Sequence, residues 1–133
     1  MKILVVDDQE MLRKSVLALL QFIIKREEVR IPSDVTILES QNGHEAFMLW
    51  EEHRDSIQII ITDYHMPVLN GEGLIEKVRA ACGGGGPLII LLSGGGIISN
   101  SKADVFIQKP FTAADLVRGF EKLGQLHGTG TEG

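Results

Sequence analysis

The sequence contains a single cysteine, Cys82, among its 133 residues. One cysteine cannot form a disulfide within the chain, and it cannot build a cysteine metal cluster. No apolar run approaches the ~18 residues that a membrane span requires. The N-terminus also lacks the basic segment and apolar core of a secretion signal. These absences lead us to expect a cytoplasmic protein in a reducing compartment.

Positive charge is scarce and scattered along the sequence. Lysine and arginine total 13 residues against 18 acidic residues, which gives a formal net charge of −5. Because binding to a nucleic acid backbone requires clustered lysine and arginine, we expect no direct nucleic acid partner, and we expect no membrane partner either. A glycine-rich loop ending in Gly-Lys-Ser/Thr is also missing, which excludes a P-loop nucleotide hydrolase.

Short apolar runs that end in polar residues are the main feature present. The runs cover residues 2–6, 35–40, 56–63, 88–93 and 105–108. Such runs are typical of strands buried on both faces of a parallel sheet. Segments with helical apolar spacing alternate with them, which predicts a three-layer α/β sandwich in residues 1–127 and a flexible tail in 128–133. We interpret Met11, Met48, Trp50 and Phe120 as packing residues.

Polar side chains stand at the ends of four of these runs. Asp7 and Asp8 follow the first run, Asp63 ends the third, Ser93 ends the fourth, and Lys109 follows the fifth. In an open parallel sheet, functional groups collect at the carboxyl ends of the strands. Three carboxylates, one hydroxyl and one ammonium group would suit one divalent cation and one phosphoryl group.

This pattern resembles the receiver domain of two-component response regulators over about residues 2–126. The resemblance is carried by Asp7-Asp8, Asp63, Met66-Pro67, Gly71, Ser93 and Lys109-Pro110-Phe111. It implies a flavodoxin-like fold with five parallel strands in the order 2-1-3-4-5. It also implies a signalling protein that takes a phosphoryl group from a histidine kinase or a histidine phosphotransfer protein. Its only catalysis would be its own phosphorylation and slow dephosphorylation.

The resemblance also gives each polar residue a role. Asp63 would be the phospho-acceptor, and it would bind Mg²⁺, or Mn²⁺ as a substitute, together with Asp7, Asp8 and the backbone carbonyl of His65. Magnesium prefers such hard oxygen ligands.

The remaining roles concern the phosphoryl group itself. Lys109 and Ser93 would contact that group, and the peptide bond before Pro110 would be cis. Ser93 and Phe106 would form the switch that reports phosphorylation.

The interval between the fourth and fifth runs departs from the family. Residues 94–104 (GGGIISNSKAD) hold three glycines and a Ser-Asn-Ser sequence. These residues disfavour helix, so we expect the family's fourth helix to be missing or reduced to a turn.

Three functions stay open at this point. A stand-alone receiver would act as a switch for a separate effector protein, or as a phosphate shuttle or sink. A constitutive interaction module would keep the pocket without using phosphorylation. A phosphomonoesterase is less favoured, because residues 64–66 supply no additional acid/base carboxylate.

Overall fold

The computed structural model describes residues 1–83, 86–95 and 100–127, and for residues 125–127 it describes the backbone alone. These residues form one five-stranded parallel sheet of order β2-β1-β3-β4-β5. The elements are β1 (Lys2–Val6), α1 (Glu10–Lys25), β2 (Thr36–Ser40), α2 (Gly43–Glu52), β3 (Ile57–Asp63), α3 (Gly71–Ala81), β4 (Leu88–Ser93), β5 (Val105–Gln108) and α4 (Ala113–His127). The predicted flavodoxin-like fold and strand order are confirmed. The predicted tail, residues 128–133, lies outside the described residues.

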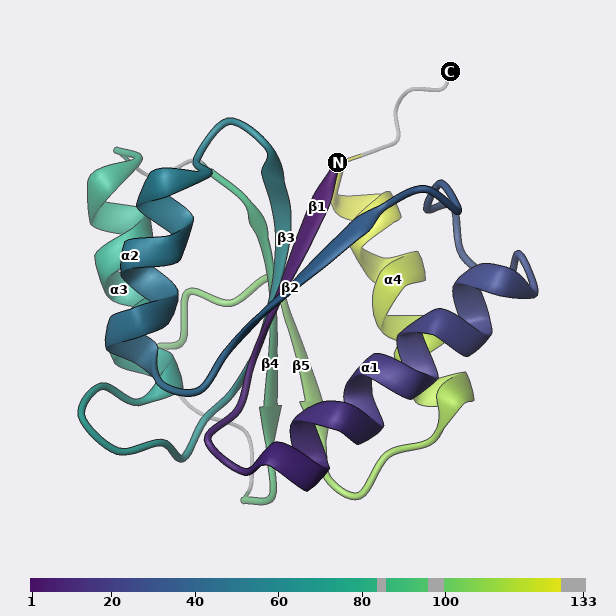
Figure 1. The fold of residues 1–133 in the computed structure, drawn as a ribbon, viewed down its shortest axis with the longest axis horizontal. Coiled ribbons are helices and arrows are strands. Elements are labelled where there is room, and N and C mark those ends of the chain that lie inside the picture. The colour runs from purple at the N-terminus through teal and green to yellow at the C-terminus, as the bar shows by residue number, and fades with distance from the viewer. Residues whose placement is uncertain (84–85, 96–99, 128–133) are drawn as a thin grey trace.

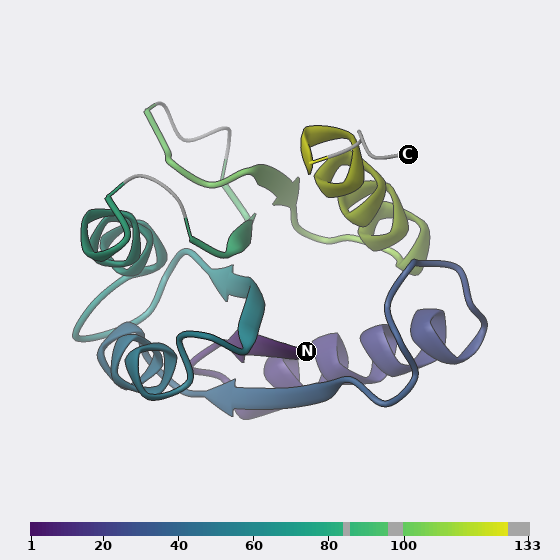
Figure 2. The ribbon, with the colours of Figure 1, turned by 90° about the horizontal axis from the view of Figure 1, so that it is seen from above.

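Helices cover both faces of the sheet. Figures 1 and 2 show α1 and α4 on one face, and α2 and α3 on the other. Side chains alternate along each strand, so Ile3 and Val5 join the core under α1 and α4, whereas Leu4 and Val6 join the core under α2 and α3. The two cores are therefore separated by the sheet and share its strands.

Side-chain caps mark where three of the helices begin. The side chains of Asn42 and Asn70 each accept a 2.8 Å hydrogen bond from the backbone N–H three residues further on. At the start of α4, Thr112 and Asp115 exchange side-chain to backbone hydrogen bonds of 2.8 and 3.2 Å. This reciprocal pair is a capping box.

The four residues interpreted as packing residues divide into two pairs. Trp50 is fully buried and Phe120 is 9 % exposed, as expected. The interpretation is wrong for Met11 and Met48, which are 83 % and 57 % exposed. Both methionines lie on helix faces that point away from the sheet, and apolar side chains commonly remain on such surfaces.

The chain has a fourth helix, α4, which follows β5. The segment between β4 and β5 is the one for which we expected a missing or shortened helix. Its described residues, 94–95 and 100–104, contain no helix, and residues 96–99 lie outside the described part. Among the described residues, no helix is long and apolar enough to cross a membrane.

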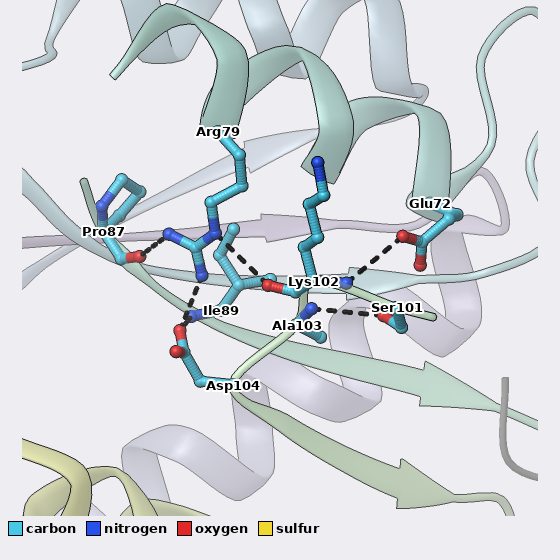
Figure 3. Close-up of polar contacts among 8 residues, drawn as sticks. All are labelled: Glu72, Arg79, Pro87, Ile89, Ser101, Lys102, Ala103 and Asp104. Carbon is cyan, nitrogen blue, oxygen red and sulfur yellow. Dashed lines mark hydrogen bonds and ion pairs between the residues drawn. The ribbon is translucent and has the colours of Figure 1, made fainter. Parts of the chain in front are cut away.

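Arg79 of α3 contacts Lys102 and Asp104, and Glu72 of the same helix accepts a 3.4 Å hydrogen bond from the backbone N–H of Lys102 (Figure 3). Arg79 Nε donates to the carbonyl of Lys102 at 3.2 Å, and its Nη1 donates to the carbonyl of Pro87 at 2.8 Å. Its Nη2 forms a 2.8 Å ion pair with Asp104. We call these contacts the Arg79 network, and through them α3 positions the chain immediately before β5.

Candidate functional site

Three carboxylates meet at the carboxyl end of the sheet. Val6 of β1 pairs with Thr62 of β3, so the residues that follow each of them, Asp7 and Asp63, lie side by side. The carboxylate oxygens of Asp7, Asp8 and Asp63 lie within 4.8 Å of one another. Asp7 and Asp63 are 2 % and 6 % exposed, whereas Asp8 faces solvent. The structure thus brings together the acidic residues that the sequence predicts.

Asp7 has one oxygen that remains available. Its backbone N–H donates to the carbonyl of Ser40, and its Oδ1 accepts a 3.0 Å hydrogen bond from the backbone N–H of Gln9. Its Oδ2 is buried and has no hydrogen-bond partner. Burial raises the pKa of Asp7 despite the hydrogen bond from Gln9, and the negative charges of Asp63 and Asp8 add to the rise. A partnerless buried carboxylate oxygen in an acidic cluster suits a cation.

Lys109 provides the positive charge of the site. Its Nζ forms an ion pair with Asp63 Oδ1. Its backbone N–H donates to the carbonyl of Ser93 at 2.8 Å, which joins the end of β5 to the end of β4. The peptide bond between Lys109 and Pro110 is cis, as predicted.

Ser93 and Phe106 lie on the same face of the sheet. Leu91 pairs with Phe106, and both belong to the core under α2 and α3. Because side chains alternate along a strand, Ser93 points to this same face two residues after Leu91. Ser93 is 2 % exposed, and its Oγ accepts a hydrogen bond from the backbone N–H of Gly95 at 3.2 Å. The two predicted switch residues therefore lie on the same face of adjacent strands, offset by two residues in the register.

The loop after β3 carries His65, whose side chain is exposed and packs edge-on against Tyr64. The backbone N–H of Gly71 donates to the carbonyl of Tyr64 at 2.8 Å, which closes this loop. A Cβ atom at Gly71 would lie only 2.3 Å from the carbonyl oxygen of Asp63. Only glycine therefore allows α3 to begin this close to the acidic cluster.

One residue that contacts the site, Arg13, is not predicted from the sequence. Arg13 on α1 donates from Nη1 to the backbone carbonyl of Asp7 at 2.8 Å. Its Nε donates to Glu39 Oε1 at 2.8 Å, and Lys14 donates to the other oxygen of Glu39 at 2.9 Å. The sequence gives no signal for the first contact, because a backbone carbonyl can accept from any donor.

An apolar cavity of about 420 Å³ adjoins the acidic cluster. It lies between α1 and the loop that connects β5 to α4, and it is lined by Asp7, Leu12, Ser15, Val16, Leu19, Lys109, Pro110 and Phe111. Leu12 is 42 % exposed, and the neighbouring Met11 is almost fully exposed. The site therefore opens beside an apolar surface.

Comparison with known proteins identifies one matching family and relatives that are similar in sequence over nearly the whole chain. The family model described as the response regulator receiver domain matches residues 3–121. The chemotaxis protein CheY homolog of Campylobacter jejuni is 38 % identical over 137 aligned positions, which cover 98 % of this chain and 95 % of the relative. Chemotaxis protein CheY1 of Helicobacter pylori is 36 % identical over 135 positions, which cover 97 % and 98 % of the two chains.

Solved structures show the same fold at lower identity. The complex of CheX, CheY, BeF₃ and Mg²⁺ from Borrelia burgdorferi matches with a TM-score of 0.75 and 19 % identity, covering 96 % of this chain and 90 % of the matched one. Chemotaxis protein CheY4 of Vibrio cholerae matches with a TM-score of 0.72 and 23 % identity, covering 91 % and 96 %.

Proposed function

The chain belongs to the response regulator receiver domain family, and on that premise we propose that it accepts a phosphoryl group on Asp63. The observation that carries the proposal is the setting of Asp63, beside two further carboxylates and in an ion pair with Lys109. The donor is a phosphohistidine of a histidine kinase or a histidine phosphotransfer protein. The receiver domain in this proposal spans residues 1–127.

The transfer exchanges one bond to phosphorus for another. A carboxylate oxygen of Asp63 attacks the phosphorus, and a P–O bond forms as the P–N bond to the donor imidazole breaks. The electron pair of the broken bond stays on the ring nitrogen, so the imidazole leaves neutral when its other nitrogen carries a proton. The Lys109 ammonium and the Ser93 hydroxyl donate hydrogen bonds to phosphoryl oxygens, where negative charge develops.

A magnesium ion fits the acidic cluster. Asp7, Asp8 and Asp63 would hold it together with the backbone carbonyl of His65, and Mn²⁺ would substitute because it accepts the same hard oxygen donors. The support is the partnerless buried Oδ2 of Asp7 and the crowding of three carboxylates. When bound, the ion would neutralise part of the charge on the carboxylates and the phosphoryl group.

The donor would approach over the first turns of α1. Met11 and Leu12 are exposed apolar side chains next to the cavity, and Phe111 lines its other side. A donor that presents an apolar helix face would bury these side chains while its histidine reaches Asp63. After transfer, Ser93 and Phe106 would signal to a separate effector protein, or the chain would serve as a phosphate shuttle or sink.

Intact mass after incubation with acetyl phosphate tests the proposal. We expect a gain of one phosphoryl group that requires Mg²⁺ and is lost in Asp63→Asn. Asp55→Asn is the matched control, because Asp55 is an exposed aspartate outside the acidic cluster. No gain in the unchanged protein, with Mg²⁺ binding confirmed by calorimetry, would contradict the proposal and favour the constitutive interaction module.

A further inference from the structure

We propose that Arg13 is a positioning residue for the metal site, because it fixes the peptide unit that joins Asp7 to Asp8. The inference rests on the proposed function, and it extends that function to a residue outside the acidic cluster. Arg13 lies in the first turn of α1 and its side chain is only 13 % exposed, although it is an arginine near the surface.

The contact acts on the backbone of the acidic pair. Nη1 of Arg13 donates to the carbonyl oxygen of Asp7 at 2.8 Å. This carbonyl belongs to the planar peptide unit that also contains the backbone nitrogen and Cα of Asp8. Fixing the carbonyl direction therefore fixes the point from which the Asp8 side chain extends.

Arg13 completes the hydrogen bonds that hold Asp7 itself. The backbone N–H of Asp7 is bonded to Ser40 and its Oδ1 to Gln9, so the Arg13 contact leaves only Oδ2 without a partner. The residue is thus held at three points, and Oδ2 is its one polar atom without a partner. Coordination of a metal depends on such hydrogen bonds from residues that do not touch the ion.

Glu39 directs the charge of Arg13 away from the cluster. Glu39 on β2 accepts from Arg13 Nε at 2.8 Å, and hydrogen bonds from Arg13 and Lys14 lower the pKa of its carboxyl group. Glu39 therefore stays ionised and neutralises the guanidinium group. Arg13 thus acts through geometry, without placing an unpaired cation beside the metal.

Calorimetric titration with Mg²⁺ alone tests this role, with thermal unfolding measured in parallel. We expect Arg13→Met to weaken Mg²⁺ binding by about 10-fold, the size of effect typical of residues that orient metal ligands. Lys14→Met is the matched control, because Lys14 shares Glu39 but makes no contact with the Asp7 carbonyl. We expect the control to bind Mg²⁺ within about 2-fold of the unchanged protein.

Two further variants separate position from charge and from folding. Glu39→Gln keeps an oxygen acceptor for Arg13 but removes the charge that neutralises it, so we expect Mg²⁺ binding to weaken less than in Arg13→Met. Arg13→Lys keeps a cation but cannot donate to both acceptors in the same way, so we expect an affinity between those of Arg13→Met and the unchanged protein. Arg13→Lys also replaces Arg13→Met in the test if circular dichroism shows the latter to be unfolded.

The outcomes distinguish this inference from the proposed function. Equal Mg²⁺ affinity in the folded Arg13 variants and the unchanged protein would overturn the positioning role, as would equal losses in Arg13→Met and Lys14→Met. If the unchanged protein binds Mg²⁺ but is never phosphorylated, the proposed function fails while the role of Arg13 stands. If it binds no Mg²⁺, both are overturned.

Discussion

At the scale of single residues, Asp7 destabilises the metal-free fold. Its pKa is raised from the usual 3.8, so the folded state binds its proton more tightly than the unfolded state does. The stability that comes from this proton is complete below pH 3.8 and is lost as the pH rises through the raised pKa. Above the raised pKa the buried carboxylate is ionised, and the burial of its charge opposes folding.

Asp7→Asn should therefore raise the melting temperature of the protein in EDTA at pH 7. The gain should shrink as the pH falls toward 3.8, because Asp7 is then protonated in the unchanged protein as well. Thermal melts across this pH range would measure both effects. Saturating Mg²⁺ should reverse the order of the two melting temperatures. A ligand that binds the folded state stabilises that state, and Asp7→Asn binds Mg²⁺ more weakly than the unchanged protein does. A lower melting temperature for Asp7→Asn in EDTA at pH 7 would contradict the argument.

Val68 lies in a strained backbone conformation in the loop between β3 and α3. Its φ angle is 71°, and its side chain is 82 % exposed, so no packing compensates for the strain. The left-handed region costs a residue with a Cβ about 1–2 kcal/mol, and asparagine tolerates it best after glycine. We expect Val68→Asn to increase the free energy of unfolding in urea by about 1 kcal/mol. Val68→Ala should gain less because alanine lacks the short polar side chain with which asparagine hydrogen-bonds locally in this region; equal gains would show that the φ angle is not the cause.

At the scale of secondary-structure elements, the Arg79 network connects α3 to the chain immediately before β5 (Figure 3). Asp104 accepts from Arg79 and also from the backbone N–H of Ile89 at 2.7 Å, so it connects α3 to β4. Replacing Arg79 would leave a part-buried carboxylate and two carbonyls without this donor.

We therefore expect Arg79→Met to lower the free energy of unfolding by about 2 kcal/mol, the cost of leaving such groups unsatisfied. Lys77→Met on the same helix is the control. Lys77 is exposed, and its ammonium group lies 4.8 Å from the centroid of the Phe47 ring, so its loss should cost about 0.5 kcal/mol. Urea unfolding followed by circular dichroism gives both values, and similar losses in the two variants would refute a special role for Arg79.

The sequence predicts those parts of the molecule that follow from local patterns. Apolar runs place the strands, and the polar residue after each run places Asp63 and Lys109 at one end of the sheet. The contacts of Arg13 and Arg79 could not be predicted in this way. Both donate to backbone carbonyls, which every residue carries, and the partner of Arg79 on the β5 side is Asp104, 25 residues away. Such contacts depend on how the elements pack, which no local pattern records.

At the scale of the whole molecule, the two cores depend on one sheet. Each strand contributes alternate side chains to the core under α1 and α4 and to the core under α2 and α3. Neither helical layer can keep its packing if the sheet separates, so we expect both cores to unfold in a single transition. The only tryptophan of the chain, Trp50, belongs to α2 and is fully buried in the core under α2 and α3. Its fluorescence therefore reports on that core alone.

A cavity in the opposite core tests this coupling. Leu116 on α4 is fully buried on the face away from Trp50, and Leu116→Ala should lower the free energy of unfolding by about 2–5 kcal/mol. Tryptophan fluorescence and circular dichroism should shift to the same lower urea midpoint, although the substitution lies across the sheet from the fluorophore. Leu74→Ala, in the same core as Trp50, is the matched control and should also move both signals together. A Leu116→Ala midpoint that falls by circular dichroism but not by fluorescence would show that the α1 and α4 layer unfolds by itself, and the two cores would then be separate cooperative units.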